Sequence, residues 1–306
     1  MERAEILSGA AALRLAKHEK TETEEKKMPG LILEGGTFRA IFSAGCMDAL
    51  LDYNMMFPYC IGVSAGITDG FSYISKQKER NLKILVNHRH DKRYIGKRNF
   101  LKCRSLFGLD FAYDELPNKV YPFDWDTFRK YEGTIRVGVT NAHTGEAEYL
   151  DGKELDSKCM MLRATCAIPL LFPEIEVNGN IYYDGGLADP IPVRKAIADG
   201  NEKNLIILTR PKTYRKKLSK STLAAAKLLK KKYPKLYPLL MNRHTAYNET
   251  VAYCERLEAE GKAVIIRPAH PIESMEKDIE VLKQTYRMGY EMTVSKMEKI
   301  KALWKE

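Results

Sequence analysis

Residues 59–66, Tyr-Cys-Ile-Gly-Val-Ser-Ala-Gly, leave the chain few choices of local fold. Their first half has the apolar character of a buried strand, and the chain continues beyond Gly66 as a predicted helix, Ile67 to about Ser75. A Gly-x-Ser-x-Gly sequence between a strand and a helix exposes the serine hydroxyl on a sharp turn, and the helix N-terminus favours negative charge there. Ser64 is therefore a candidate nucleophile. An ordinary strand–turn–helix connection is the alternative interpretation of the glycines Gly62 and Gly66.

A similar unit lies upstream. Residues 30–34 predict a short buried strand, the segment Gly35-Gly36-Thr37-Phe38-Arg39 a tight loop, and residues from about 40 to 53 a helix with apolar side chains at helical spacing. Two successive strand–helix units predict a mainly parallel sheet covered by helices. The consecutive N–H groups of the loop can converge on one oxygen, as in an oxyanion hole. A plain turn or a degraded nucleotide loop are alternatives, but both common nucleotide-binding glycine patterns are absent.

The middle of the chain places a carboxylate at the end of a strand. Residues 134–140 and 146–150 predict a strand pair, and residues 174–177 and 180–183 flank an Asn-Gly turn, which is a strong hairpin signal. This hairpin ends at Asp184-Gly185-Gly186, where the glycines leave space beside the carboxylate. Asp184 is therefore a candidate general base, although an Asp-Gly pair is more often a simple turn.

The composition changes after Pro211. The segment from Arg210 to Arg243 contains twelve lysines or arginines and no acid, which exceeds the net charge of +10 for the whole chain. Residues 221–232 and 243–260 predict helices, residues 263–266 a strand, and residues 273–305 two more helices. A basic segment of this kind indicates contact with an anionic membrane surface, or only a solvated helix face. Nucleic acid is not expected, because few aromatic residues lie between the basic ones.

Three segments follow from these patterns: a charged N-terminal extension (1–27), a catalytic domain (28–212) and a basic, mainly helical extension packed on it (213–306). The chain has no apolar run long enough for a transmembrane helix, and its N-terminus lacks the apolar core of a secretory signal. Its six cysteines show no C-x-x-C pair, and His88 and His90 do not share a helical face. We therefore expect reduced thiols, no metal, and a cytoplasmic location with access to the inner membrane surface.

Four motifs in this order resemble the patatin-like phospholipase family over about residues 29–208. They are the glycine-rich loop with its basic residue, the segment Gly62-Val63-Ser64-Ala65-Gly66, the loop Ala167-Ile168-Pro169, and Asp184-Gly185-Gly186. The separation of about 120 residues between the serine and the aspartate also fits that family. The segment around residues 264–268 looks like a bacterial branch of it.

The resemblance implies a three-layer α/β/α sandwich and a Ser–Asp dyad. Ser64 would be the nucleophile that forms an acyl-enzyme, and Asp184 the general base. The amides of Gly35, Gly36 and Thr37, with Arg39 near them, would bind the oxyanion. The substrate would be an acyl ester of a lipid, of the phospholipase or lysophospholipase type, and no cofactor would be needed.

Two positions depart from the family pattern. Thr37 and Ala40 stand where the family loop usually carries glycine, and a β-branched residue at a positive φ at position 37 would cost about 1–2 kcal/mol. Two other functions remain open. One is a Ser-His-Asp esterase of the α/β-hydrolase type in the order Ser64, Asp184, His270. The other is a catalytically weak lipid- or membrane-binding protein on the same fold.

Overall fold

The structure, a computed structural model, describes residues 28–305, so the extension predicted for residues 1–27 lies outside the described residues. The strands are β1 (Gly30–Leu33), β2 (Tyr59–Val63), β3 (Thr134–Asn141), β4 (Ala147–Asp151), β5 (Ile175–Val177), β6 (Asn180–Asp184), β7 (Asn204–Ile207) and β8 (Ala263–Ile266). The longer helices are α2 (Ile41–Asp52), α3 (Ser64–Ile74), α4 (Arg80–His88), α9 (Lys220–Leu229), α10 (Leu236–Ala259) and α11 (Ile279–Ser295). The shorter ones are α5 (Lys97–Cys103), α6 (Trp125–Arg129), α7 (Met160–Thr165), α8 (Val193–Ala198) and α12 (Met297–Lys301).

The strands form one sheet in the order β5-β6-β3-β2-β1-β7-β8, with β4 paired to β3. The five strands from β3 to β8 in this order run parallel, and Leu31 of β1 lies between Cys60 of β2 and Leu205 of β7. At the other end of the sheet, β4 and β6 each pair antiparallel with β3, and β5 pairs antiparallel with β6. The predicted α/β fold with a mainly parallel sheet is confirmed.

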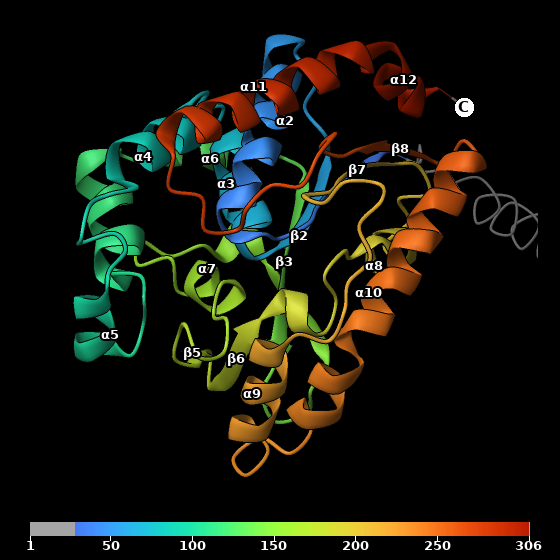
Figure 1. The fold of residues 1–306 in the computed structure, drawn as a ribbon. Coiled ribbons are helices and arrows are strands. Elements are labelled where there is room, and N and C mark those ends of the chain that lie inside the picture. The colour runs from blue at the N-terminus through green and yellow to red at the C-terminus, as the bar shows by residue number, and fades with distance from the viewer. Residues whose placement is uncertain (1–27, 306) are drawn as a thin grey trace, which may run out of the picture.

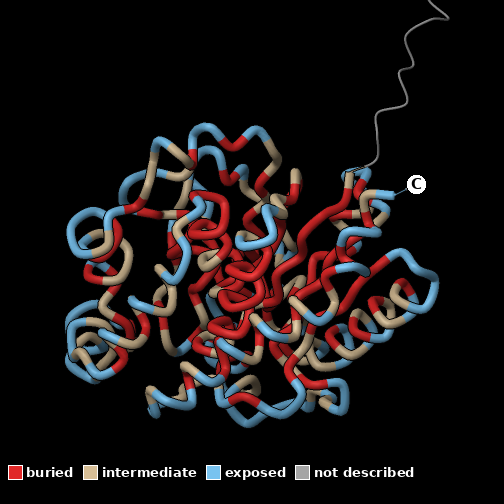
Figure 2. Tube along the Cα trace, turned by 90° about the horizontal axis from the view of Figure 1, so that it is seen from above, coloured by how far each residue is buried: buried red, intermediate tan, exposed pale blue. Residues whose placement is uncertain are grey.

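Helices cover both faces of this sheet (Figure 1). Leu31 and Leu33 pack against α2, α3 and α12 on one face, whereas Ile32 between them packs against α8 and α10 on the other. Because the central strands are buried on both faces, they carry nearly continuous apolar runs. Figure 2 shows buried residues through the middle of the molecule and exposed residues at its rim. The layers are those of a three-layer α/β/α sandwich.

The C-terminal part of the chain contributes to the core. Strand β8 extends the sheet beside β7, and α11 crosses α2 at close range. A Cβ added at Gly45 would lie 2.0 Å from the carbonyl oxygen of Tyr286, and one added at Gly289 would lie 2.1 Å from that of Phe42. The two helices therefore approach each other through reciprocal glycines. The Sγ atom of Cys46 also donates to the Gly289 carbonyl at 3.3 Å.

Some elements differ from the sequence prediction. Helix α10 begins seven residues before residue 243, and Pro238 lies in its first turn, where the missing N–H costs no hydrogen bond. Helices α4 and α5 and a π-helix (Phe111–Val120) occupy residues 80–120, for which the sequence analysis predicted no element. No helix in the described part of the chain is long and apolar enough to cross a bilayer.

Candidate active site

Ser64 lies on a strained turn between β2 and α3. The helix begins at Ser64 itself, three residues before its predicted start, and Ser64 has a φ of 54°. Such a left-handed conformation is costly for a residue with a Cβ and persists only where the surroundings enforce it. The backbone N–H of Ser64 donates to the Thr165 hydroxyl at 2.8 Å, and this hydroxyl donates to the carbonyl of Gly138 at 2.5 Å. Thr165 thus links the turn to β3.

The two motif glycines let this turn pack on the end of β1. A Cβ at Gly66 would lie 2.4 Å from the carbonyl oxygen of Glu34, and one at Gly62 would lie 2.7 Å from that of Leu33. Real side chains do not come this close to backbone atoms. The Gly-x-Ser-x-Gly spacing therefore brings Ser64 next to the loop that follows β1.

Asp184 ends β6 and faces Ser64. Its carboxylate is 4 % exposed and accepts a 2.8 Å hydrogen bond from the N–H of Gly186. Burial raises the pKa of this carboxyl group, and the neighbouring Ser64 hydroxyl opposes the shift. The Thr140 hydroxyl donates to the Asp184 carbonyl at 2.8 Å, and Gly185 packs against β3, where a Cβ would lie 2.1 Å from a carbonyl oxygen. The structure therefore brings the predicted nucleophile and base together.

The loop after β1 supplies unpaired N–H groups beside Ser64. A Cβ added at Gly35 would lie 2.7 Å from the Cβ of Ser64. The N–H of Phe38 donates to the carbonyl of Ser274, and that of Arg39 donates to Gly36. The N–H groups of Gly35, Gly36 and Thr37 have no hydrogen-bond partner among residues 28–305. These three amides are the available donors for an oxyanion.

Thr37 and Ala40, the two residues of this loop that stand where the family usually has glycine, differ in backbone conformation. Thr37 has a positive φ of 54°, which is strained for a β-branched residue. Ala40 has an ordinary right-handed conformation and needs no glycine. The side chain of Arg39 lies against Thr209, with 3.5 Å between Nε and Oγ1, and burial, followed by the charge of Arg210, lowers its pKa.

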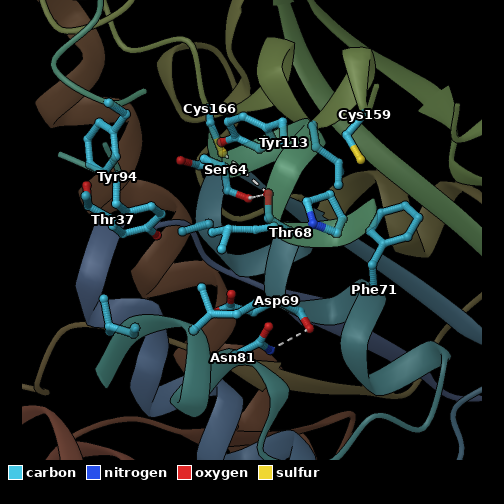
Figure 3. A pocket seen from close by; sticks show the side chains of 18 of the residues that line it. Thr37, Ser64, Thr68, Asp69, Phe71, Asn81, Tyr94, Tyr113, Cys159 and Cys166 are labelled. Carbon is cyan, nitrogen blue, oxygen red and sulfur yellow. Dashed lines mark hydrogen bonds between the residues drawn. The ribbon is translucent and has the colours of Figure 1, made fainter. Parts of the chain in front are cut away.

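An apolar cavity of about 170 Å³ opens beside Ser64 (Figure 3). Most of its lining is apolar or aromatic, including Phe38, Ile41, Phe71, Leu85, Phe107, Tyr113, Leu116 and Phe172. The thiol of Cys166 lies near Ser64 and 3.4 Å from the Thr68 hydroxyl. Asp69 also lines this cavity, and burial raises the pKa of its carboxyl group to about 8. The cavity can hold an apolar chain.

A second cavity, of about 420 Å³, also reaches Ser64 and contains Asp184. We call it the cationic cavity, because its lining includes the four basic side chains of Arg39, Arg210, Lys216 and Arg243. The sequence analysis did not assign Lys216 and Arg243 to the site, nor Thr165 and Thr140. The signal for the first two was the basic segment 210–243, which was interpreted as a surface.

The positions of the histidines do not support the alternative of a Ser-His-Asp esterase. No histidine of residues 28–305 lines either cavity. His270, the proposed third member, lies on an exposed loop. Within the described residues, no group of three or more side chains could hold a metal ion.

Comparisons with known proteins divide the chain into two matched regions. A family model described as "Patatin-like phospholipase" matches residues 31–197, and one described as "Domain of unknown function (DUF6363)" matches residues 233–305. The chain is 24 % identical over 277 residues to "Uncharacterized protein YjjU" of Escherichia coli (strain K12), with 85 % of this chain and 74 % of that protein covered. The crystal structure of VipD from Legionella pneumophila is similar with a TM-score of 0.48 and 14 % identity, covering 89 % of this chain and 67 % of that one.

Proposed function

Because the chain belongs to the patatin-like phospholipase family, whose model covers 31–197 of its 306 residues, we propose that it hydrolyses acyl esters of lipids with Ser64 as nucleophile and Asp184 as general base. The observation that carries the proposal is that Ser64, on its strand–helix turn, and the buried Asp184 carboxylate line the same cavity. The unpaired amides at positions 35–37 and the apolar cavity beside Ser64 support it.

In the first half of the reaction, the Ser64 oxygen attacks the ester carbonyl carbon while its proton passes to Asp184. The carbonyl oxygen becomes an oxyanion, which the amides of Gly35, Gly36 and Thr37 stabilise. The C–O bond of the ester then breaks, and Asp184 returns the proton to the leaving alcohol. The acyl group stays on Ser64 as an ester.

In the second half, Asp184 takes a proton from a water molecule, and the hydroxyl attacks the acyl-enzyme. Collapse of this second oxyanion frees the fatty acid and returns the proton to Ser64. Burial raises the pKa of Asp184, which makes its carboxylate a stronger base than an exposed one. A dyad without imidazole is therefore chemically competent.

The acyl chain fits the apolar cavity. Each methylene that leaves water there contributes about 0.8 kcal/mol to binding. We expect the enzyme to prefer apolar acyl chains over short acetyl groups for this reason.

The test is hydrolysis of chromogenic acyl esters by the wild type, Ser64→Ala and Asp184→Asn, with His270→Ala and His244→Ala as matched controls. We expect both dyad variants to lose at least about 100-fold in kcat, and the histidine variants to keep most activity. Equal turnover by the wild type and both dyad variants would reject the dyad. Loss of activity in His270→Ala alone would favour the Ser-His-Asp esterase.

A second candidate function, membrane binding with weak catalysis, is favoured by one observation. Nine of the twelve basic residues between Arg210 and Arg243 are exposed: Lys212, Arg215, Lys217, Lys220, Lys227, Lys230, Lys231, Lys232 and Lys235. Two leucines of this segment, Leu218 and Leu228, are also exposed, by 38 % and 65 %. Cations beside exposed apolar side chains suit an anionic membrane surface.

A further inference from the structure

The cationic cavity gathers its basic side chains from distant parts of the chain. Arg39 comes from the loop after β1, Arg210 follows β7, Lys216 lies in the segment before α9, and Arg243 lies on α10. Three of these four residues lie outside the region that the patatin-like model matches. The C-terminal part of the chain therefore builds one wall of a cavity that contains Ser64 and Asp184.

None of the four cations forms an ion pair within the described residues. The Nε atom of Arg243 donates to the carbonyl of Gly186 at 2.7 Å, two residues after Asp184. The Lys216 Nζ atom lies 4.6 Å from the ring centroid of Tyr247, and the Arg210 guanidinium carbon lies 4.4 Å from that of Tyr214. These contacts hold the side chains in place without neutralising them.

The two acidic side chains that line the cationic cavity, Glu34 and Asp184, do not neutralise its four positive charges. Both carboxylate oxygens of Glu34 are already engaged, one by the N–H of Thr209 at 2.6 Å and the other by the Tyr247 hydroxyl at 2.9 Å. The Asp184 carboxylate accepts a hydrogen bond from the N–H of Gly186 at 2.8 Å. Four basic side chains therefore share the cavity with two acids, and half-buried charges in excess are costly without a counter-ion.

The pKa of Lys216 reflects the burial of this side chain and the excess of positive charge around it. Burial is the largest cause that lowers the pKa of its ammonium group, to about 7, and the charges of Arg243, Arg39 and Arg210 lower it further. The charge of Glu34 acts in the opposite direction. An anion bound among these side chains would favour the charged form of Lys216 and would be bound in turn by it.

Hydroxyl donors complete the cavity wall. Ser219, Ser221 and Thr222 line it from the first turn of α9, and Ser219 caps that helix by accepting from the N–H of Thr222 at 3.1 Å. A helix N-terminus, guanidinium groups and hydroxyls together are the donors that bind phosphate in proteins.

We propose that the cationic cavity is a subsite for a phosphate-bearing head group of the acyl ester substrate. The inference rests on the proposed function, since it places the ester at Ser64 and the acyl chain in the apolar cavity. Thr37, Ser64 and Ile168 line both cavities, so a molecule with an apolar chain and a phosphate can occupy the two with its ester at the nucleophile. The preferred substrate is an acylglycerol phosphate over a neutral acylglycerol.

A binding experiment tests the subsite without turnover. Ser64→Ala protein is titrated calorimetrically with inorganic phosphate, octyl phosphate and the neutral octyl glucoside. We expect octyl phosphate to bind at least about tenfold more tightly than either of the others. Equal binding of inorganic and octyl phosphate would overturn the lipid head group in favour of a free phosphate site, and no binding of either would overturn the subsite.

Charge variants assign the binding to this cavity. In the Ser64→Ala background, Lys216→Gln and Arg210→Gln should each weaken octyl phosphate binding about tenfold, because each removes a charge-assisted contact. Lys299→Gln removes an exposed charge of α12, which lines neither cavity, and should leave binding unchanged. Circular dichroism verifies that each variant folds. Equal effects of all three variants would overturn the assignment.

A kinetic experiment separates this inference from the proposed function. With an active Ser64, we compare kcat/KM for a 1-acylglycerol 3-phosphate and for the monoacylglycerol with the same acyl chain. The ratio of the two should fall about tenfold in Lys216→Gln and Arg210→Gln and stay at the wild-type value in Lys299→Gln. Hydrolysis of both esters at an unchanged ratio would overturn the head-group subsite while the hydrolase function stands. Hydrolysis of neither would reject the hydrolase function, and the calorimetric result would then decide the anion site.

Discussion

The backbone N–H of Ser64 donates a 2.8 Å hydrogen bond to the hydroxyl of Thr165, a residue 101 positions further along the chain. This bond spans the turn at which Ser64 takes a left-handed conformation, and the same hydroxyl is anchored to the carbonyl of Gly138. Thr165 is fully buried and does not line either cavity. We therefore propose that Thr165 positions the turn that carries Ser64.

Thr165→Val should therefore lower kcat by about 10-fold to 100-fold, because small displacements of a nucleophile have effects of this size. Thr165→Ser keeps the hydroxyl and should restore most of kcat. Esterase kinetics are measured beside thermal unfolding of all three proteins. If the valine and serine variants lose equal activity, the hydrogen bond is not what positions Ser64.

Thr37→Gly should stabilise the protein by about 1 kcal/mol and preserve activity. The threonine has a φ of 54°, and glycine adopts this conformation without the steric cost of a Cβ. Urea unfolding measures the change. Ala40→Gly is the matched control, since position 40 has a right-handed conformation and glycine there should destabilise by about 0.5–1 kcal/mol. A loss of stability in both variants would show that Thr37 is not strained.

Asp69→Asn should change how stability depends on pH. Burial raises the pKa of Asp69 to about 8 in the folded protein, with the charge of Arg80 opposing the shift, whereas the unfolded chain releases this proton near about pH 4. Between these values the folded state holds more protons, so wild-type stability falls as pH rises through the window.

The asparagine variant lacks this ionisable carboxyl group, so its stability does not depend on pH through position 69. Its free energy of unfolding relative to the wild type should grow by more than about 1 kcal/mol between pH 4 and pH 8 and stay constant below that range. Urea unfolding at a series of pH values gives the difference. Parallel pH profiles for the two proteins would contradict an uncharged Asp69.

Lys227→Gln combined with Lys231→Gln should weaken binding to anionic phospholipid vesicles about 10-fold to 30-fold. Both lysines are exposed, and each contributes about 1 kcal/mol near an anionic surface. Vesicle sedimentation at increasing salt measures the effect, with vesicles of neutral lipid as the control. Binding that ignores salt and anionic lipid content would remove the electrostatic explanation.

The sequence alone predicted those parts of the site that depend on local signals. The Asn178-Gly179 turn fixes the register of β5 and β6 and so places Asp184, and the apolar run before Ser64 with its flanking glycines predicts the strand–helix turn. In both places a few adjacent residues determine the conformation of the backbone.

The cationic cavity could not be predicted in this way. Arg210, Lys216 and Arg243 face inward while nine other basic residues of the same segment face solvent, and no period in the sequence separates the two groups. Arg243 lies on α10, and the backbone of Lys216 is bound to Asn248 of that helix, so their placement depends on contacts between distant segments. The π-helix at residues 111–120 was missed because it contains Pro117 and shows no regular apolar period. Helix α4 does carry a signal, since Leu82, Leu85 and Val86 stand at helical spacing, and this signal was not used.

The reciprocal glycine contact between α2 and α11 also affects the order in which the protein matures on the ribosome. Cys46 and Gly289, which share a hydrogen bond across this contact, are 243 residues apart. Helix α2 leaves the ribosome long before its partner is translated, because chains emerge from the N-terminus. Residues 35–37 lead through the 3₁₀ turn Thr37–Ala40 into α2, so the helix beside this loop gains its partner late in translation. The contact between α2 and α11 can therefore form only after residues 279–295 have been translated.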